Sequence, residues 1–280
     1  MHVLGVVAPE REAQVVADRL ADRFGDEGRV AVVRRTETGG TRDESGARAE
    51  SATATYELGD DGWTVRGRDR SPSDLLDDLA PDHDYALLVG FPEADVPQLV
   101  VGDAGASTDG AKDADEVAGD VLLEAEAAEN VDPAEVRARL DATEPYETLE
   151  SLVAEVKRSE DAPYSGAIAT FTGRVRAKED PDDEPTELLE FEKYEGVAEE
   201  RMDAISAELE EREGVFEAAM HHRTGVIEYG EDIVFVVVLA GHREEAFRTV
   251  EDGINRLKDE VPLFKKEVTT DEQFWVHQRS

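Results

Sequence analysis

Carboxylates dominate this chain and limit how it can fold. The 280 residues include 68 Asp and Glu against 30 Lys and Arg, giving a formal net charge of −38. The acidic residues are spread along the whole sequence rather than gathered in one tail. Such a charge repels itself unless salt screens it, so the pattern predicts a halophilic protein. It also argues against nucleic acid and anionic membranes as partners, because both carry charge of the same sign.

Composition sets the other limits. The length leaves room for two domains, and 40% hydrophobic residues can supply a core for each. The chain has no cysteine, which excludes disulfides, iron–sulfur clusters and cysteine nucleophiles. His221 and His222 are neighbours on a predicted strand and point to opposite faces, so we expect no bound metal and no cofactor. The apolar start, residues 2–7, is short, and no stretch reaches membrane-spanning length, so we expect a cytoplasmic protein.

The first part of the chain alternates strand and helix patterns. The predicted strands are residues 2–7, 30–33 and 85–90, the predicted helices are residues 10–24 and 73–79, and residues 55–58 and 62–65 form a predicted hairpin. This alternation is typical of an α/β domain with a mostly parallel sheet, which we assign to residues 1–102. Few large apolar residues follow, so residues 103–144 are predicted to be an acidic Ala/Gly-rich linker with short helices near 115–128 and at 133–140.

Residues 145–280 are predicted to form an α+β domain. The predicted helices are residues 146–156, 197–213 and 244–258, and the predicted strands are residues 166–172, 188–194, 218–223, 225–229 and 233–240. On the last helix, Phe247, Val250, Ile254 and Leu257 are expected on one buried stripe. Two central helices against a mainly antiparallel sheet define the class.

Basic side chains gather where loops of the second domain meet strands or helices. They are Arg174, Arg176, His242, Arg243, Lys258, Lys265 and Lys266. In so acidic a chain, a local cationic group indicates an anion to bind. Arginine forks suit phosphate, Gly173 lets the backbone approach a ligand, and the start of a helix favours an anion. A lysine near another cation also loses its proton more readily, which suits a base or a nucleophile.

Each of these residues also has an ordinary explanation. Lys258 could simply complement the dipole of its helix. Arg174 and Arg176 could pair with the acidic loop that follows them, and His242 could be only a helix-start residue. Their shared chemistry in an acidic chain favours a binding site.

Six segments of residues 146–280 carry a specific pattern. They are residues 166–176 (GAIATFTGRVR), 189–194 (LEFEKY), 222–225 (HRTG), 230–235 (GEDIVF), 241–243 (GHR), and 257–258 (LK) followed by 262–267 (PLFKKE). In order and spacing they resemble the catalytic (large) subunit of molybdopterin synthase, the MoaE family, of the haloarchaeal type. The resemblance implies an enzyme that adds two sulfurs to cyclic pyranopterin monophosphate, making the dithiolene of molybdopterin. The sulfur would come from a small ubiquitin-like partner whose C-terminal Gly-Gly carries a thiocarboxylate.

The same resemblance implies the site residues. The substrate-binding residues would be Arg174, Val175, Arg176, His242, Arg243, Lys266 and Glu267. Lys258 would be the catalytic lysine, acting as acid or base while the sulfur attacks, and Lys265 would stabilise the developing oxyanion or acyl intermediate. The resemblance further implies a homodimer of large subunits within a heterotetramer, with Arg176 reaching across the dimer interface.

The first domain carries a weaker pattern, in residues 1–7 (MHVLGVV) and 84–93 (DYALLVGFPE). These segments resemble MobB, the P-loop protein that assists attachment of a guanine nucleotide to molybdopterin. Where a P-loop requires Gly-Lys-Ser/Thr, residues 8–15 read APEREAQV, whose acidic residues repel phosphate. Val89 stands where an acidic residue is expected. We therefore predict a degenerate P-loop-like domain that does not hydrolyse GTP.

Two other functions are compatible with the sequence. One is a non-catalytic scaffold that binds the ubiquitin-like protein or a pterin. The other is a nucleotide-dependent adaptor for guanylyl transfer, which depends on the altered first domain. The presence of both Lys258 and Lys265 favours the enzyme, since a scaffold needs neither.

Overall fold

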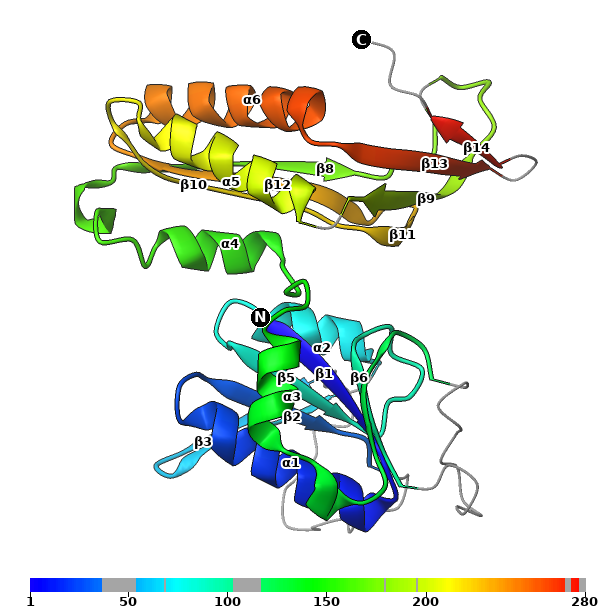
Figure 1. The fold of residues 1–280 in the computed structure, drawn as a ribbon. Coiled ribbons are helices and arrows are strands. Elements are labelled where there is room, and N and C mark those ends of the chain that lie inside the picture. The colour runs from blue at the N-terminus through cyan, green and yellow to red at the C-terminus, as the bar shows by residue number, and fades with distance from the viewer. Residues whose placement is uncertain are drawn as a thin grey trace. The chain divides into compact units, whose positions relative to one another are not determined.

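The chain forms two compact units, Met1–Tyr146 and Glu147–Ser280 (Figure 1). The computed structural model describes residues 1–36, 54–67, 69–102, 117–178, 180–194, 196–269 and 273–276. In that part of the chain, no helix is both long and apolar enough to cross a membrane. The first unit is α/β and the second is α+β, as predicted.

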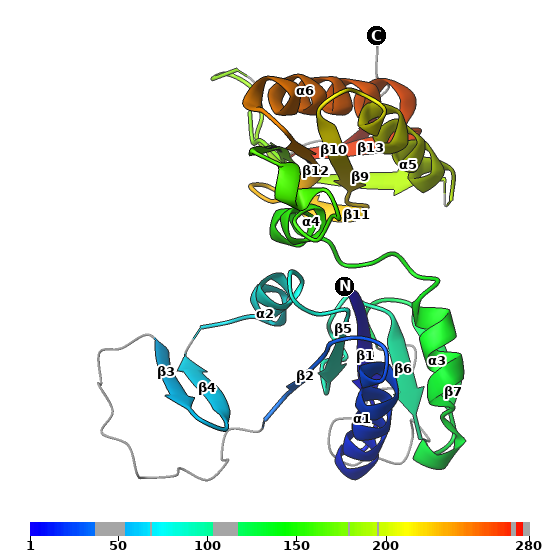
Figure 2. The same ribbon diagram turned by 90° about the vertical axis from the view of Figure 1, so that its left-hand side faces the viewer.

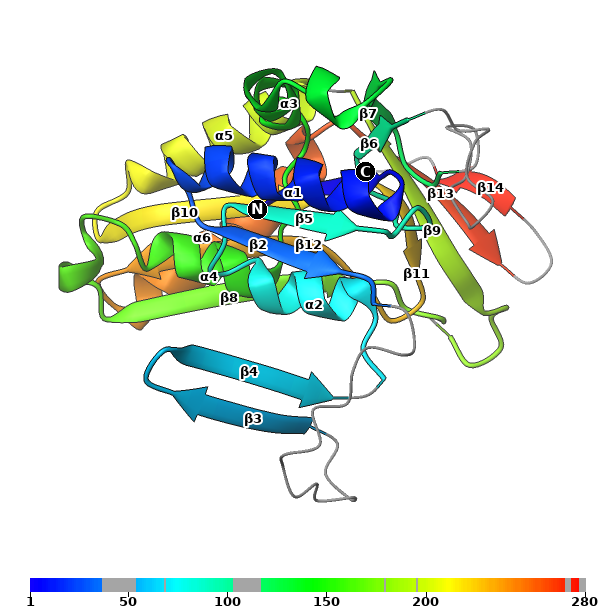
Figure 3. The same ribbon diagram turned by 90° about the horizontal axis from the view of Figure 1, so that it is seen from below.

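A five-stranded parallel sheet, in the order β2-β5-β1-β6-β7, forms the centre of the first unit. Its elements are β1 (His2–Val7), α1 (Glu10–Gly25), β2 (Val30–Arg34), α2 (Pro72–Leu79), β5 (Tyr85–Val89), β6 (Gln98–Val101), β7 (Val121–Ala125), the 3₁₀ turn η2 (Ala128–Asn130) and α3 (Pro133–Leu140). Figure 3 shows β2 and β5 running in the same direction. Because side chains alternate along a strand, Leu4 and Val6 pack with α1 and α3, whereas Val3 packs with α2.

Residues 121–140 belong to this first unit, which corrects the linker predicted at residues 103–144. Strand β7 pairs with β6 where a helix near residues 115–128 was expected, and α3 fully buries Val136 and Leu140. The pattern misled because β7 is short, and its pairing with β6 is a tertiary contact that local composition does not reveal. Residues 103–116 lie outside the described part of the chain.

The predicted hairpin is present as β3 (Ala54–Gly59) and β4 (Gly62–Gly67), apart from the five-stranded sheet (Figure 2). Tyr56 lies opposite Val65, and Leu58 lies opposite Trp63, so these four side chains share one face. All four are exposed, Leu58 by 85%. The hairpin therefore contributes little to the core of the unit.

The start of α1 lacks the features of a phosphate-binding P-loop. Pro9 precedes the helix without a side-chain cap, and Glu10 and Glu12 lie in its first turn. At the end of β2, Arg35 pairs with Glu93 rather than presenting a free cation. Carboxylates at a helix start disfavour a phosphate there. The absence of GTP hydrolysis stays a prediction.

Two antiparallel sheets build the second unit, one in the order β10-β12-β8 and one in the order β11-β9-β13-β14. The elements are α4 (Leu149–Val156), the 3₁₀ turn η3 (Ala162–Tyr164), β8 (Ala167–Arg174), β9 (Thr186–Lys193), α5 (Val197–Glu210), β10 (Val215–His222), β11 (Gly225–Glu228), β12 (Asp232–Ala240), α6 (Arg243–Glu260), β13 (Leu263–Thr269) and β14 (Gln273–Val276). Figure 1 shows α5 and α6 on one face of the three-stranded sheet and α4 on the other.

Strand β12 is the centre of this unit. Its residues from Ile233 to Ala240 are all apolar and all buried, as expected for a middle strand covered on both faces. Val236 and Val238 pack in the core shared with α5 and α6. Phe235 packs with α4 on the opposite face.

Two expectations for the second unit were wrong. Phe247 is 67% exposed, because the face of α6 that meets the sheet carries Ala246 and Val250 instead. The segment from Leu263 to Thr269 was not predicted as a strand, yet it pairs along its length with β9. Its run of charged side chains hides the strand pattern, since both faces of β13 carry charge.

Gly5 should be intolerant of any side chain. A Cβ there would lie 1.9 Å from Oε1 of Gln98, whose side chain is fully buried. We expect Gly5→Ala to lower the free energy of unfolding by about 1 to 3 kcal/mol through overpacking.

The matched control is Gly25→Ala at the end of α1, where an added Cβ meets nothing within 4 Å. It should leave stability within about 1 kcal/mol of the wild type. Calorimetry in high salt compares the two variants, and equal stability would contradict the tight contact between Gly5 and Gln98.

Candidate functional site

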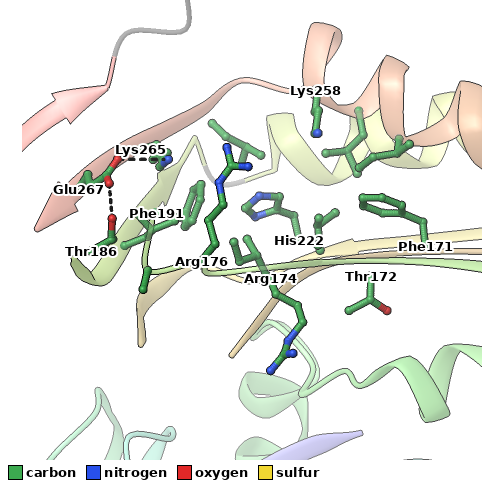
Figure 4. A pocket seen from close by; sticks show the side chains of 18 of the residues that line it. Phe171, Thr172, Arg174, Arg176, Thr186, Phe191, His222, Lys258, Lys265 and Glu267 are labelled. Atoms are coloured by element: carbon green, nitrogen blue, oxygen red, sulfur yellow. Dashed lines mark hydrogen bonds and ion pairs between the residues drawn. The ribbon is translucent and has the colours of Figure 1, made fainter. Parts of the chain in front are cut away.

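A cavity of about 830 Å³ lies in the second unit, lined by β8, β9, β13 and the end of α6. It gathers five of the residues that the sequence analysis predicts to be catalytic or substrate-binding. They are Arg174, Arg176, Lys258, Lys265 and Glu267 (Figure 4). The fold thus brings cations from segments far apart in the chain to one cavity.

Lys258 enters the cavity from the last turn of α6. The preceding Leu257 is 1% exposed and Ile254 is buried one turn earlier, so the core fixes this end of the helix. Figure 4 shows the Lys258 side chain directed towards the other labelled residues. Its Nζ lies 6.0 Å from the centre of the Phe171 ring, at the outer limit of a cation–π contact. The lysine is exposed, so a ligand can reach it.

Strand β13 contributes Lys265 and Glu267 on the same side, because they are two residues apart. Nζ of Lys265 lies 3.5 Å from Oε2 of Glu267, and the hydroxyl of Thr186 donates a hydrogen bond to the other carboxylate oxygen (Figure 4). Lys266 points to the opposite face, where its Nζ donates to Glu190 at 2.8 Å, and it does not line the cavity. The geometry therefore separates Lys266 from the other predicted site residues of this strand.

Arg174, the last residue of β8, and Arg176, just beyond it, differ in orientation. Nε of Arg174 lies 3.1 Å from Oδ1 of Asp232, and its guanidinium also donates to the carbonyl of Gly230. In Figure 4 Arg174 turns away from the lysines, whereas Arg176 extends towards them. Val175, between the two, is 2% exposed and packs in the core. Arg176 is therefore the better placed of the two to meet an anion beside the lysines, and Val175 anchors the segment.

His242 and Arg243 do not line this cavity. They border a separate hollow of about 490 Å³ at the start of α6, together with Gly166, Gly241, Glu244 and Glu245. Arg243 is the first residue of α6 and Lys258 is in its last turn. At about 1.5 Å per residue, the helix separates their backbones by about 22 Å. Within one chain, these residues cannot hold the same small group as Lys258.

His222 lines the cavity, although the sequence did not indicate it as a site residue. It is the last residue of β10 and is 5% exposed, and its ring meets the Phe191 ring edge-on at 4.7 Å between centroids. The signal was the alternation along β10, where Ala218, Met220 and His222 point to the same side and the first two belong to the core. His221 stacks on Phe235 on the other face, so the two histidines diverge as predicted.

The environment of His222 keeps its imidazole neutral. Burial lowers its pKa to about 4, because the protonated ring would lose its hydration, and His221 and Lys193 lower it as well. A hydrogen bond between Nδ1 and the carbonyl oxygen of Arg223, 2.8 Å long, opposes this shift without overcoming it. The ring is therefore uncharged at physiological pH.

The sequence of this chain is similar to proteins of one family. The family model described as MoaE protein matches residues 142–260. The chain is 55% identical over 280 residues, the full length of both proteins, to a probable molybdopterin synthase of Haloferax volcanii. It is 36% identical over 138 residues, 49% of this chain and 84% of the relative, to the molybdopterin synthase catalytic subunit of Bacillus subtilis. The crystal structure of Bacillus subtilis MobB matches 50% of this chain and 97% of its own at 16% identity, with a TM-score of 0.38.

Lowering the pH should reduce the stability of the second unit, partly because His222 takes up a proton more readily in the unfolded chain. Its pKa is about 4 in the folded protein against an ordinary 6.5, so between these values the unfolded chain binds more protons, and stability falls as the pH falls. His222→Asn removes this contribution. Lowering the pH from about 7 to about 4.5 should therefore destabilise the wild type by about 2 to 3 kcal/mol more than the variant.

Chemical denaturation of both proteins across this range provides the measurement. The carboxylates titrate in both proteins, so their contribution cancels in the difference. A difference in stability that does not change with pH would show that the fold does not hold the ring neutral.

Proposed function

This chain belongs to the molybdopterin synthase family, and on that premise we propose that it transfers sulfur from a thiocarboxylated ubiquitin-like small subunit to cyclic pyranopterin monophosphate. It is an enzyme of molybdenum cofactor biosynthesis, and the proposed product is the dithiolene of molybdopterin. The observation that carries the proposal is the meeting of Arg176, Lys258 and Lys265 in one cavity. The cytoplasmic location predicted from the sequence remains part of this proposal.

The cations of the cavity suit both reactants. The substrate is a cyclic phosphate, and the tail of the sulfur donor ends in an anion. A partly desolvated cavity strengthens the attraction between such groups and the cations around them. The volume of about 830 Å³ also falls in the range of ordinary small-molecule sites.

The two lysines take different parts in this proposal. Lys258 is exposed beside Phe171 and acts as the acid or base while the thiocarboxylate sulfur attacks the substrate. Lys265, paired with Glu267, stabilises the developing oxyanion or acyl intermediate. The hydroxyl of Thr186 donates a hydrogen bond to the Glu267 carboxylate and fixes its position, so Lys265 can pair with it again after the reaction.

The small subunit and a second copy of this chain complete the proposed assembly, a homodimer within a heterotetramer. The tail of the small subunit enters the cavity, which supplies the lysines. His242 and Arg243 lie too far from Lys258 in the same chain, but a symmetric dimer can bring the start of α6 from one protomer to the cavity of the other. We assign them to the phosphate of the substrate bound in the partner's cavity.

Replacing Lys258 tests the catalytic assignment. With thiocarboxylated small subunit and cyclic pyranopterin monophosphate in high salt, Lys258→Ala should lower the rate of product formation by about 10²- to 10⁴-fold, because the proton-transfer group is lost. Thermal unfolding and binding of the small subunit should be unchanged. Lys157→Ala, at the exposed end of α4, is the matched control and should keep full activity. Full turnover by a folded Lys258→Ala protein would remove this lysine from the mechanism.

Mixed dimers test whether Arg243 acts across the interface. Lys258→Ala and Arg243→Ala chains carry different tags, and dimers holding one of each are isolated. If Arg243 serves the partner's cavity, one cavity of the mixed dimer holds both changes and the other holds neither, so roughly half of the wild-type activity should return. If Arg243 serves its own chain, both cavities are damaged. Activity no higher than that of the two parent homodimers would therefore contradict the shared site.

A further inference from the structure

We propose that His222 is a substrate-positioning residue, whose Nε2 accepts a hydrogen bond from an N–H or O–H group on the ring system of the bound pterin. This inference rests on the proposed function, since it names a further residue for the same substrate. The cations of the cavity donate hydrogen bonds, whereas the neutral ring of His222 would accept one.

The backbone fixes the tautomer of His222. Its Nδ1 lies 2.8 Å from the carbonyl oxygen of Arg223. A carbonyl oxygen can only accept a hydrogen bond, so Nδ1 carries the hydrogen. In a neutral imidazole the other nitrogen then has a free lone pair. Nε2 is therefore an acceptor, and its character does not depend on any ligand.

The ring is also fixed in place on the cavity wall. It is 5% exposed and packs edge-on against Phe191, with an angle of 69° between the ring planes. Figure 4 shows the imidazole in the space between Phe191, Lys258 and Arg176. A side chain held by packing on one side and by a backbone bond on the other loses little entropy when it binds a ligand. This is the condition for precise orientation of a substrate.

The charged neighbours of the ring keep it neutral. Burial lowers the pKa of His222 to about 4, and Lys193 and His221 act in the same direction. Lys193 itself is paired with Glu199, so that carboxylate does not stabilise a protonated ring. At neutral pH the imidazole is too weak a base to remove a proton from the substrate. Its role is to orient the ring system and not to transfer protons.

His222 places a neutral acceptor beside the cations of the cavity. Arg176, Lys258 and Lys265 can only donate hydrogen bonds. Glu267 has one oxygen bonded to Thr186 and the other near Lys265. The remaining carboxylates of the lining, Asp183 and Glu184, are exposed. A pterin carries N–H donors as well as a phosphate, and Nε2 of His222 offers them a buried partner among the described residues of the cavity.

Two substitutions separate the acceptor from the structural bond. The amide nitrogen of asparagine can take the place of Nδ1 and donate to the Arg223 carbonyl, but asparagine has no acceptor where Nε2 lies. Glutamine reaches further and can place an amide oxygen near the position of Nε2. His221→Asn, on the opposite face of β10, is the matched control.

The measurement is kcat and KM for cyclic pyranopterin monophosphate, at saturating thiocarboxylated small subunit and in high salt. We expect His222→Asn to lower kcat/KM by about 10- to 100-fold, mainly through KM, because the substrate donor loses its partner. His222→Gln should recover most of that loss, and His221→Asn should match the wild type. A folded His222→Asn protein with wild-type kcat/KM would overturn the proposal, as would a His222→Gln protein no better than His222→Asn.

Nitrogen NMR of wild-type protein labelled at histidine tests the same contact without any variant. The resonance of His222 Nε2 should have the shift of an unprotonated nitrogen, and it should move when cyclic pyranopterin monophosphate is added alone. No movement at saturating substrate would overturn the proposal. Absence of product from the wild type, with substrate shown to bind, would instead contradict the proposed function.

Discussion

The pairing of β12 with its two neighbours determines where the functional groups of the second unit lie. Val234, near the start of β12, is opposite both Gly173 of β8 and His222 of β10. This register places the C-terminal ends of β8 and β10 at the same end of the sheet. His222, at the end of β10, and Arg176, just after β8, therefore lie close to the same cavity. The apolar run of β12 is buried on both faces, and a shift of one residue would exchange those faces. Gly173 also depends on this register, because a Cβ there would lie 2.6 Å from Cγ1 of Val234.

The elements that the sequence predicts well are those whose burial follows a local period. The buried run of β12 and the core stripe of α6 at Val250, Ile254 and Leu257 belong to this class. The sequence failed where pairing partners decide the structure, as for β7, which needs β6, and β13, which needs β9. In both cases the segment itself is short or charged, and hydrogen bonding to a strand distant in sequence makes it a strand.

The candidate site shows the same division. Lys258 and Lys265 line one cavity, and the described residues of its lining come from several separate segments of the chain. The sequence could not show that Lys266 faces Glu190. It did place His242 and Arg243 at the start of the helix that carries Lys258 in its last turn, but it did not draw the consequence that the two groups lie far apart. It considered His222 only in arguing against a metal site shared with His221, because no periodic pattern shows which inward-facing side chain lines a cavity. The halophilic character predicted from charge fits the relative from Haloferax volcanii.

The length of α6 restricts how this chain can change during evolution. The helix carries Arg243 at one end, Lys258 at the other and a buried stripe between them. One inserted or deleted residue would rotate one end against the other by about 100° and shift it by about 1.5 Å. Lys258 would then leave the cavity, or the stripe would leave the core. Changes in length among related sequences should therefore collect in connections such as the one between β8 and β9, while α6 keeps a constant number of residues.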